Sequence, residues 1–269
     1  MPELPEVETV VRSLKPRLVG RRIVSFRSTW PRKVFPSARA VAKRNAGATV
    51  IDVWRRGKWI VWDLDGNGHL LIHLRMSGRF EWANGQPTPL PHTRATWTLD
   101  NSETLLFVDP RKFGVIRHTR DVNAELGDLG IEPLGRTFAP RALQGLLARR
   151  KGRIKTILLD QTVIAGLGNI YVDESLFAAG IHPETRAADI RPEQISGLTR
   201  AIRATLREAI QRNGTSIDWI YPDGGMQDYL RVYGRAGEAC GRCGDVIARI
   251  VLGQRGTHFC PTCQPVSRA

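Results

Sequence analysis

The first residues of the chain carry groups that can do nucleophilic chemistry. The sequence begins Met-Pro-Glu-Leu-Pro-Glu, so Pro2 becomes the N-terminal residue once Met1 is removed. An α-amino group has a pKa of about 7.7–8.0, against about 10.4 for lysine, so a useful fraction is neutral at pH 7. Attack of this secondary amine on a sugar C1′ yields an iminium, which acidifies the 2′ position and permits β-elimination of the 3′ phosphate.

Two carboxylates accompany Pro2 on the same stretch of chain. Glu3 is adjacent and Glu6 lies one helical turn further on, where they can move protons or stabilise a cation. The same residue types also begin ordinary helices, because proline suits the first turn and glutamate complements the positive end of the helix dipole. On these residues alone, a nucleophile and a simple helix start both remain open.

The four cysteines form the second chemical constellation. Two Cys-x-x-Cys pairs enclose 16 residues, and the ligands are Cys240, Cys243, Cys260 and Cys263. Two such knuckles at this separation predict one tetrahedral four-cysteine Zn²⁺ site, which is closed and therefore structural. We expect the zinc to hold a hairpin whose tip presents Arg249, Arg255 and His258 to phosphate.

A histidine upstream of the cysteines offers an alternative metal site. His182-x-Glu184 resembles the motif of the zinc deaminases that act on nucleobases, which pair it with Pro-Cys-x-x-Cys. Neither Cys-x-x-Cys of this chain begins with Pro-Cys. We therefore expect His182 to cap or link helices.

Hydrophobic periodicity predicts the elements that position these groups. Residues 5–19 have apolar positions spaced by three and four, which predicts a helix. Between about 22 and 120 the apolar residues alternate, and turns are predicted at Asp65-Gly66, Asn84-Gly85 and Asp100-Asn101, which is typical of a β-sandwich or barrel. Helices are then predicted at 141–148, 169–179 and 192–212, before strand-like segments around the cysteines. The fold class is α+β.

The charge of the chain indicates a polyanionic partner. Lys and Arg number 40 and Asp and Glu number 26, which gives a net charge of +14. Nucleic acid is the commonest such partner, an anionic membrane surface is the rival, and a merely basic soluble protein is the third interpretation. No stretch has the roughly 18 apolar residues of a membrane span. Because a signal peptide is also absent, we expect a cytoplasmic protein with reduced thiols.

Motifs along nearly the whole chain resemble formamidopyrimidine-DNA glycosylase, of the bacterial family that includes endonuclease VIII. They are MPELPEVETV at the start, RRGKW, DPRKFG, GLGNIYVDESLF and the QRGTHFCPTCQ end. The resemblance implies a helix and β-sandwich domain at 1–120 and a linker at 121–137. It implies a helix–two-turn–helix domain at 138–228 and a zinc hairpin at 229–269.

The same resemblance implies roles for individual residues. Pro2 is the Schiff-base nucleophile, Glu3 the proton donor, and Glu6 assists near the amine. Lys58 acts in β-elimination and binds phosphate, although by itself it also fits a solvated strand lysine. Arg255 serves δ-elimination and contacts phosphate.

Further residues are implied to contact the DNA. The backbone contacts are His92, Arg111, Lys151, Lys155 and Asn169. Met76, Arg111 and Phe113 fill the gap left by an extruded base, with Phe113 as a wedge and Arg111 facing the orphaned partner. Two plainer interpretations stand beside these: Lys151 lies in a basic run that a solvated surface would also contain, and Met76 and Phe113 also suit a strand core.

One loop departs from the family pattern. Residues 214–228 read GTSIDWIYPDGGMQD, whereas the family continues Thr-Ser/Thr-Leu-Arg-Asp, with a longer glycine-rich stretch and a phenylalanine. Thr215 and Ser216 are kept, and the arginine and the phenylalanine are not. Because this loop covers the flipped base in the family, the choice of lesion stays open.

The resemblance implies a bifunctional glycosylase and abasic-site lyase of base-excision repair. Its substrates would be oxidised purines, 8-oxoguanine and formamidopyrimidines, in double-stranded damaged DNA. We expect a monomer associated with the nucleoid. The alternatives are an endonuclease VIII-like enzyme for oxidised pyrimidines, a non-catalytic zinc protein that binds damaged DNA, and a basic zinc protein that binds ribosomal RNA.

Overall fold

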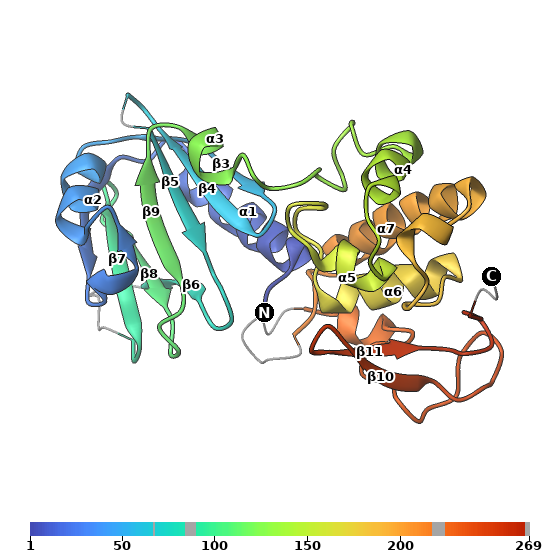
Figure 1. Cartoon of the computed structure of the whole chain (residues 1–269). Helices are drawn as coiled ribbons and strands as arrows, with labels where there is room; N and C mark the ends of the chain where they lie inside the picture. The colour runs from blue at the N-terminus through green and yellow to red at the C-terminus, as the bar shows by residue number, and fades with distance from the viewer. Residues whose placement is uncertain (67, 84–89, 217–223, 267–269) are drawn as a thin grey trace. The chain divides into compact units, whose positions relative to one another are not determined.

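The computed structural model describes residues 1–66, 68–83, 90–216 and 224–266. The chain divides into two compact units, which consist mainly of Met1–Asp128 and of Leu129–Thr215 with Gly224–Ala269 (Figure 1). The turn expected at Asn84-Gly85 lies outside the described residues. The division into four parts at 120, 137 and 228 stays a prediction.

The first unit opens with helix α1 (Leu4–Leu18), which confirms the helix predicted at 5–19 to within one residue at each end. Its apolar stripe, which includes Val7, Val10 and Leu14, is buried in the core of this unit. Pro16 lies inside the last turn without ending the helix. Gly20 follows at a φ of 81°, a left-handed conformation that favours glycine.

Two β-sheets, in which the strands are not in sequence order, follow α1 and form a β-sandwich. One sheet has the strand order β1-β7-β8-β6 and the other β2-β9-β5-β4-β3, with all pairs antiparallel except β2 and β9. The strands are β1 (Ile23–Ser28), β2 (Val34–Phe35), β3 (Val50–Arg56), β4 (Trp59–Leu64), β5 (Gly68–His73), β6 (Arg79–Ala83), β7 (Thr93–Leu99), β8 (Thr104–Val108) and β9 (Val115–Thr119).

Aromatic side chains fill the middle of this sandwich. The rings of Trp62 and Trp97 lie 5.2 Å apart, and Phe80 lies 6.0 Å from Trp97. Burial of a large apolar side chain contributes about 1.5–3 kcal/mol, so this cluster is a main source of stability for the first unit. Three short helical elements complete the unit: η1 (Pro31–Lys33), α2 (Ala38–Asn45) and α3 (Val122–Leu126).

The second unit is built around a helical layer. Its helices are α4 (Pro140–Ala148), α5 (Ile154–Leu159), α6 (Asn169–Ala179), α7 (Pro192–Gln211), η2 (Ala187–Asp189) and η3 (Met226–Tyr229). The three helices predicted for this region correspond to α4, α6 and α7, and α5 was not predicted. The apolar face of α7, with Ile195, Leu198, Ile202 and Leu206, is buried as its periodicity predicts.

A hairpin of two antiparallel strands, β10 (Ala248–Leu252) and β11 (Arg255–Phe259), belongs to the same unit. Leu252 pairs with Arg255, so Gly253 and Gln254 alone form the turn. Both have positive φ angles, 53° and 61°, as a tight hairpin turn requires. The turn therefore places Arg255 directly at the hairpin tip.

Within the described residues, no helix combines the length and apolarity needed to cross a membrane.

Candidate functional site

The start of α1 holds the two carboxylates predicted to serve the nucleophile. Pro2, Glu3 and Glu6 are buried, whereas 43% of Met1 is exposed. The Glu3 backbone N–H donates to Glu6 Oε2 at 2.8 Å, which fixes the chain immediately after Pro2. Because both carboxylates lie at the positive end of the helix and are shielded from water, their electrostatic effect on a nearby cation is stronger than at the surface.

Lys58 lies in the turn between β3 and β4 and is buried, with 6% of its surface exposed. The interpretation of Lys58 as a solvated strand lysine is therefore wrong. The next residue, Trp59, pairs across the sheet with His73 on β5, and the two rings meet edge to face at 4.9 Å.

His73 is a neighbour of Lys58 that the sequence did not single out. Burial, followed by the charges of Arg75 and Lys58, lowers the pKa of His73 to about 3. The imidazole is therefore neutral at pH 7, and its Nδ1 accepts the Arg75 N–H at 2.9 Å. One histidine in an apolar strand carries little sequence signal, because only the sheet register brings it beside Lys58.

Three loops of the sandwich carry the residues predicted to fill a base gap and to contact DNA. Met76 lies between β5 and β6, Arg111 and Phe113 lie between β8 and β9, and His92 directly precedes β7. Met76 is 36% exposed and Phe113 is 45% exposed, which contradicts the strand-core interpretation of both. The Arg111 guanidinium carbon lies 5.0 Å from the centre of the Phe113 ring. The exposed trio can therefore meet a ligand.

Lys155 does not occupy the surface position that a phosphate contact needs. Its side chain is fully buried on α5, and its Nζ forms an ion pair with Asp173 Oδ1 at 2.6 Å. The same Nζ donates to the Gly256 carbonyl at 2.9 Å. The predicted DNA contact of Lys155 is therefore wrong, because the ammonium instead joins α5, α6 and β11 within the unit.

Asn169 and His258 extend this internal network. Asn169 is the first residue of α6, and its Nδ2 donates to the Gly256 carbonyl at 2.9 Å. The backbone N–H of His258 on β11 donates to Asp173 Oδ2 at 2.9 Å. The hairpin is thus fixed to α6 by hydrogen bonds at Gly256 and at His258.

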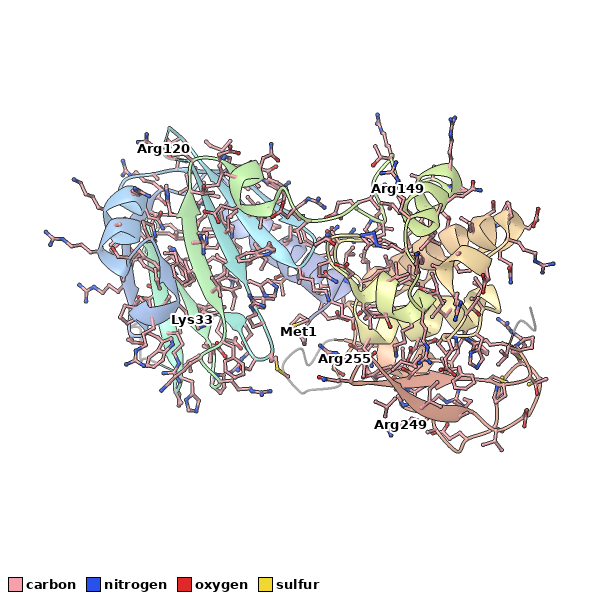
Figure 2. All side chains as sticks on the ribbon, in the orientation of Figure 1. Met1, Lys33, Arg120, Arg149, Arg249 and Arg255 are labelled. Atoms are coloured by element: carbon pink, nitrogen blue, oxygen red, sulfur yellow. The ribbon has the colours of Figure 1, made fainter. Side chains whose placement is uncertain are left out.

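The basic side chains expected to meet phosphate that are exposed in this unit are Lys151, Arg249 and Arg255. Arg249 and Arg255 lie on the hairpin strands, and Lys151 lies in the segment between α4 and α5, two residues after the labelled Arg149 (Figure 2). Because these side chains are exposed, they are accessible to a phosphate, and the phosphate contacts of Lys151 and Arg255 stay predictions.

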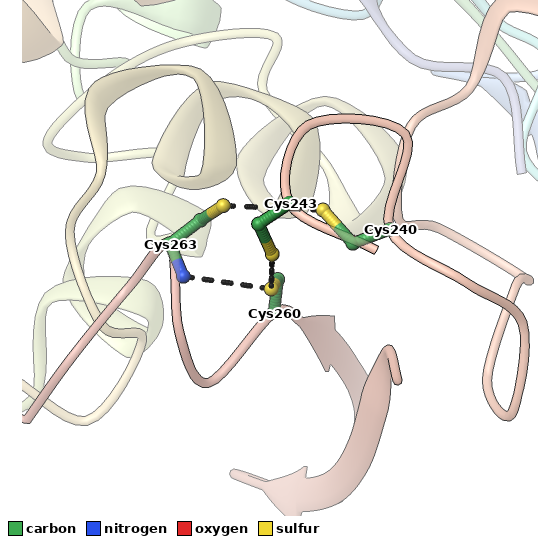
Figure 3. A group of neighbouring side chains, drawn as sticks. All are labelled: Cys240, Cys243, Cys260 and Cys263. Atoms are coloured by element: carbon green, nitrogen blue, oxygen red, sulfur yellow. Dashed lines mark hydrogen bonds between the residues drawn. The ribbon is translucent and has the colours of Figure 1, made fainter. Parts of the chain in front are cut away.

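The four cysteines converge as a metal site requires (Figure 3). Their Sγ atoms all lie within 4.8 Å of one another, with Cys240–Cys263 at 3.9 Å and Cys243–Cys260 at 3.4 Å. A tetrahedral zinc with Zn–S bonds of about 2.3 Å needs S···S separations of about 3.8 Å, so the set fits one structural Zn²⁺. Three of the cysteines also pack with Phe177 of α6, which joins the zinc site to the helical layer.

His182 lies apart from the cysteine cluster. It is buried, its ring meets Phe259 edge to face at 4.6 Å, and its Nδ1 accepts the Glu184 N–H at 3.2 Å. It therefore links the turn after α6 to β11, a helix to a strand segment, rather than capping or linking helices as expected.

The ends of the loop at 214–228 are fixed by backbone hydrogen bonds. The Gly225 N–H donates to the Arg212 carbonyl at 2.8 Å, and the Met226 N–H donates to the Gly214 carbonyl at 2.9 Å. Thr215 is buried and Ser216 is half-buried. Residues 217–223, where the sequence departs from the family, lie outside the described residues.

Three family models match the chain in order. They are the formamidopyrimidine-DNA glycosylase N-terminal domain at residues 1–116, the formamidopyrimidine-DNA glycosylase H2TH domain at 129–220, and the zinc finger found in FPG and IleRS at 237–266. The third match covers all four cysteines.

Curated relatives and solved structures match this chain over nearly its full length. The formamidopyrimidine-DNA glycosylase of Chloroflexus aurantiacus is 46% identical over 98% of both chains, and that of Symbiobacterium thermophilum is 44% identical over 99% of this chain and 90% of its own. A MutM structure in complex with carbocyclic 8-oxo-G containing DNA superposes with a TM-score of 0.92 at 39% identity, covering 98% of this chain and 100% of the other. The Lactococcus lactis Fpg bound to abasic-site DNA gives a TM-score of 0.91 at 37% identity, covering 98% and 99%.

Proposed function

The chain belongs to the formamidopyrimidine-DNA glycosylase family, and we propose that it removes oxidised purines from duplex DNA and then cleaves the strand at the resulting abasic site. The observation that carries this proposal is the burial of three charged side chains of the first unit: Glu3 and Glu6 at the start of α1, and Lys58 in the turn between β3 and β4. Burial of charged groups is costly, so a buried set often marks a functional site, and two members of this set closely follow Pro2, which supplies the N-terminal amine once Met1 is removed.

In the first step, the neutral amine of Pro2 attacks C1′ of the damaged nucleotide. The C1′–N bond to the base breaks, and the base leaves with the proton that the amine gives up. The C1′–O4′ bond then breaks with Glu3 donating a proton to the ring oxygen, so the sugar opens and the nitrogen becomes an iminium with no N–H, a cation that Glu6 favours electrostatically.

In the second step, the iminium makes the 2′ proton acidic. Loss of this proton and cleavage of the C3′–O bond expel the 3′ phosphate, and the ammonium of Lys58 favours the charge that builds on the phosphate. A further elimination breaks the C5′–O bond and expels the 5′ phosphate, with Arg255 as the phosphate contact. Hydrolysis of the iminium then releases the sugar remnant and frees Pro2 for another cycle.

Extrusion of the damaged base depends on the exposed trio of the first unit. Phe113 wedges into the stack and Met76 adapts to the void. Arg111 offers its guanidinium donors to the orphaned partner, which suits the acceptors of the cytosine opposite an oxidised guanine. His92 adds a backbone contact from the neighbouring loop.

Binding of the duplex on either side of the lesion depends on basic and polar side chains that contact phosphates. Lys151, Arg255 and Asn169 are the proposed contacts of the second unit, and zinc maintains the hairpin that carries Arg255. We further propose that the protein acts as a monomer on DNA of the nucleoid in the cytoplasm.

Borohydride trapping tests the nucleophile and the lesion together. Reduction of the iminium links the enzyme to DNA, so we expect a covalent adduct on duplexes containing 8-oxoguanine opposite cytosine. A Pro2→Gly variant should trap at least roughly a hundredfold less, because the secondary amine is lost.

Pro5→Gly is the matched control, since Pro5 is a buried proline of the same helix but not terminal. It should keep trapping wherever it folds. Equal trapping by both variants would remove Pro2 from the mechanism. Adducts on oxidised pyrimidines alone would favour the endonuclease VIII-like alternative, and duplex binding without any adduct, even on abasic DNA, would favour a non-catalytic binder.

A further inference from the structure

One buried carboxylate lies behind all three DNA-facing loops of the first unit. Asp109 is the residue after β8, and 1% of its surface is exposed. Its Oδ1 accepts a short hydrogen bond from the Ser77 hydroxyl and the Arg111 N–H at 3.2 Å. Its Oδ2 accepts the Gly114 N–H at 2.7 Å. The side chain therefore joins the Met76 loop to both ends of the loop that carries Arg111 and Phe113.

The backbone of Asp109 reaches the third loop. Its N–H donates to the His92 carbonyl at 3.0 Å, and its carbonyl accepts from Arg94 Nε at 2.8 Å. His92 itself adopts a φ of 67°, which is uncommon for a residue with a side chain. The hydrogen bond from Asp109 helps to hold this conformation.

A packing contact independent of these hydrogen bonds holds the same loops. The ring of Phe107, on β8, lies against Gly78 of one loop and Gly114 of the other. A Cβ atom would come within 2.7 Å of the ring at Gly78 and within 2.5 Å at Gly114. Both distances are too short for any side chain, so the backbones approach the ring as closely as only glycine allows.

We propose that Asp109 and Ser77 are positioning residues that fix the base-extruding trio before DNA binds. The inference rests on the proposed function of Met76, Arg111 and Phe113. Neither Asp109 nor the nearly fully buried Ser77 touches the solvent-facing tips, so they act through the loops. Loops held in the bound arrangement do not lose conformational freedom on binding, and a small misplacement of an inserted side chain slows the step it serves.

Position 109 needs a side chain with two hydrogen-bond acceptors, which the Asp109 carboxylate provides and other polar groups do not. Every described partner of the Asp109 side chain is a donor: the Ser77 hydroxyl and the N–H groups of Arg111 and Gly114. An asparagine would turn an NH₂ group toward at least one of these donors while keeping the volume. Asp109→Asn therefore breaks the network, and Ser77→Ala removes two bonds from it, the one that the hydroxyl donates to Asp109 and the one that it accepts from the Arg111 N–H at 3.3 Å.

The test separates base extrusion from the later chemistry. We expect Ser77→Ala and Asp109→Asn to slow single-turnover release of 8-oxoguanine by roughly ten- to a hundredfold. Strand cleavage at a preformed abasic site, which has no base to extrude, should change by less than about threefold. The preference for cytosine over adenine opposite the lesion should also fall, because Arg111 is no longer held. Ser37→Ala, which removes the hydroxyl that accepts the Ala40 N–H at the start of α2, is the matched control and should leave all three readouts unchanged.

Phe113→Ala distinguishes failure of this inference from failure of the proposed function. If Phe113→Ala slows base release while Ser77→Ala and Asp109→Asn do not, the positioning role is wrong and the trio stands. If Phe113→Ala has no effect, the trio itself is wrong. If Ser77→Ala loses lesion release and abasic cleavage equally, its role is structural only, and the inference is overturned even where Asp109→Asn fails to fold.

Discussion

The two units of the molecule hold their exposed functional side chains by different means. In the first unit, hydrogen bonds to one buried carboxylate, Asp109, order the loops around Met76 and Phe113. In the second unit, four cysteines and the buried Lys155–Asp173 pair order the hairpin that carries Arg255. Neutral donors around a carboxylate tolerate partial loss, whereas a metal site or a buried ion pair that loses one member leaves charges without compensation.

This difference predicts that the second unit fails in an all-or-none manner, and that the first fails in graded steps. It also predicts which substitutions change DNA affinity without changing catalysis, and which do the reverse. The zinc and the ion pair belong to the unit proposed to bind flanking DNA, and the start of α1 belongs to the unit proposed to do chemistry.

Zinc removal should have the largest effect. We expect about one zinc per chain, and Cys260→Ser or strong chelation should release it, because a closed site needs all four thiolates. Binding of a zinc of this kind is worth about 10–16 kcal/mol in small metal-dependent domains, so the hairpin should lose its order. Affinity for duplex DNA, followed by fluorescence anisotropy, should fall at least about tenfold.

The control is zinc itself, which should restore binding when added back after chelation. The thermal transition of the first unit should stay in place throughout. A metal assay that finds no zinc, or unchanged binding after its loss, would contradict the contrast between the units.

Lys155→Met should come next in size. It leaves the Asp173 carboxylate buried without its cation, which typically costs about 3–5 kcal/mol of the free energy of unfolding. Lys151→Met is the matched control, because an exposed lysine usually changes stability by no more than about 0.5 kcal/mol. Urea unfolding measures both, and a Lys155→Met/Asp173→Leu double variant should recover much of the loss. Equal stability of the two single variants would remove the ion pair as an anchor.

At neutral pH the smallest of these effects concerns His73, whose contribution to stability changes as the pH falls. Its pKa falls to about 3 in the folded protein, so the folded state binds fewer protons than the unfolded state between that pH and about 6.5. The stabilisation is therefore present above about pH 6.5 and is lost as the pH falls toward 3, with a slope of up to about 1.4 kcal/mol per pH unit.

His73→Gln should flatten this part of the stability profile. Parallel profiles for His73→Gln and the unaltered protein would show that the buried imidazole does not set the acid sensitivity of the first unit.

Periodicity and turn residues predicted most of the fold, and the exceptions have physical causes. Helix α2 has a start signal in Ser37, whose side chain caps it, but it is short and lies in a region dominated by alternation. Helix α5 reads IKTILL, a run rich in β-branched residues that favours a strand by propensity. Its helical form depends on burial of one face, which local sequence does not reveal.

The functional sites were predictable where the residues that form them are close together in the sequence. Four cysteines in two short motifs predicted their metal site, and the catalytic roles of the carboxylates beside Pro2 stay predictions. Lys155 failed for the opposite reason, because its partners Asp173 and Gly256 are distant in sequence. Asp109 lies in the same DPRKFG motif as Arg111 and Phe113, yet its role depends on Ser77, which only sheet pairing brings near.

The aromatic core of the sandwich has one more consequence, for spectroscopy. The chain has seven tryptophans, and six of them, Trp62 and Trp97 among them, precede Leu129. The seventh, Trp219, lies outside the described residues, so the described part of the second unit contributes no indole emission. Six of the seven indoles therefore report on the first unit, while circular dichroism at the helical band is weighted toward α4, α6 and α7. The two optical signals weight the two units differently, without a label.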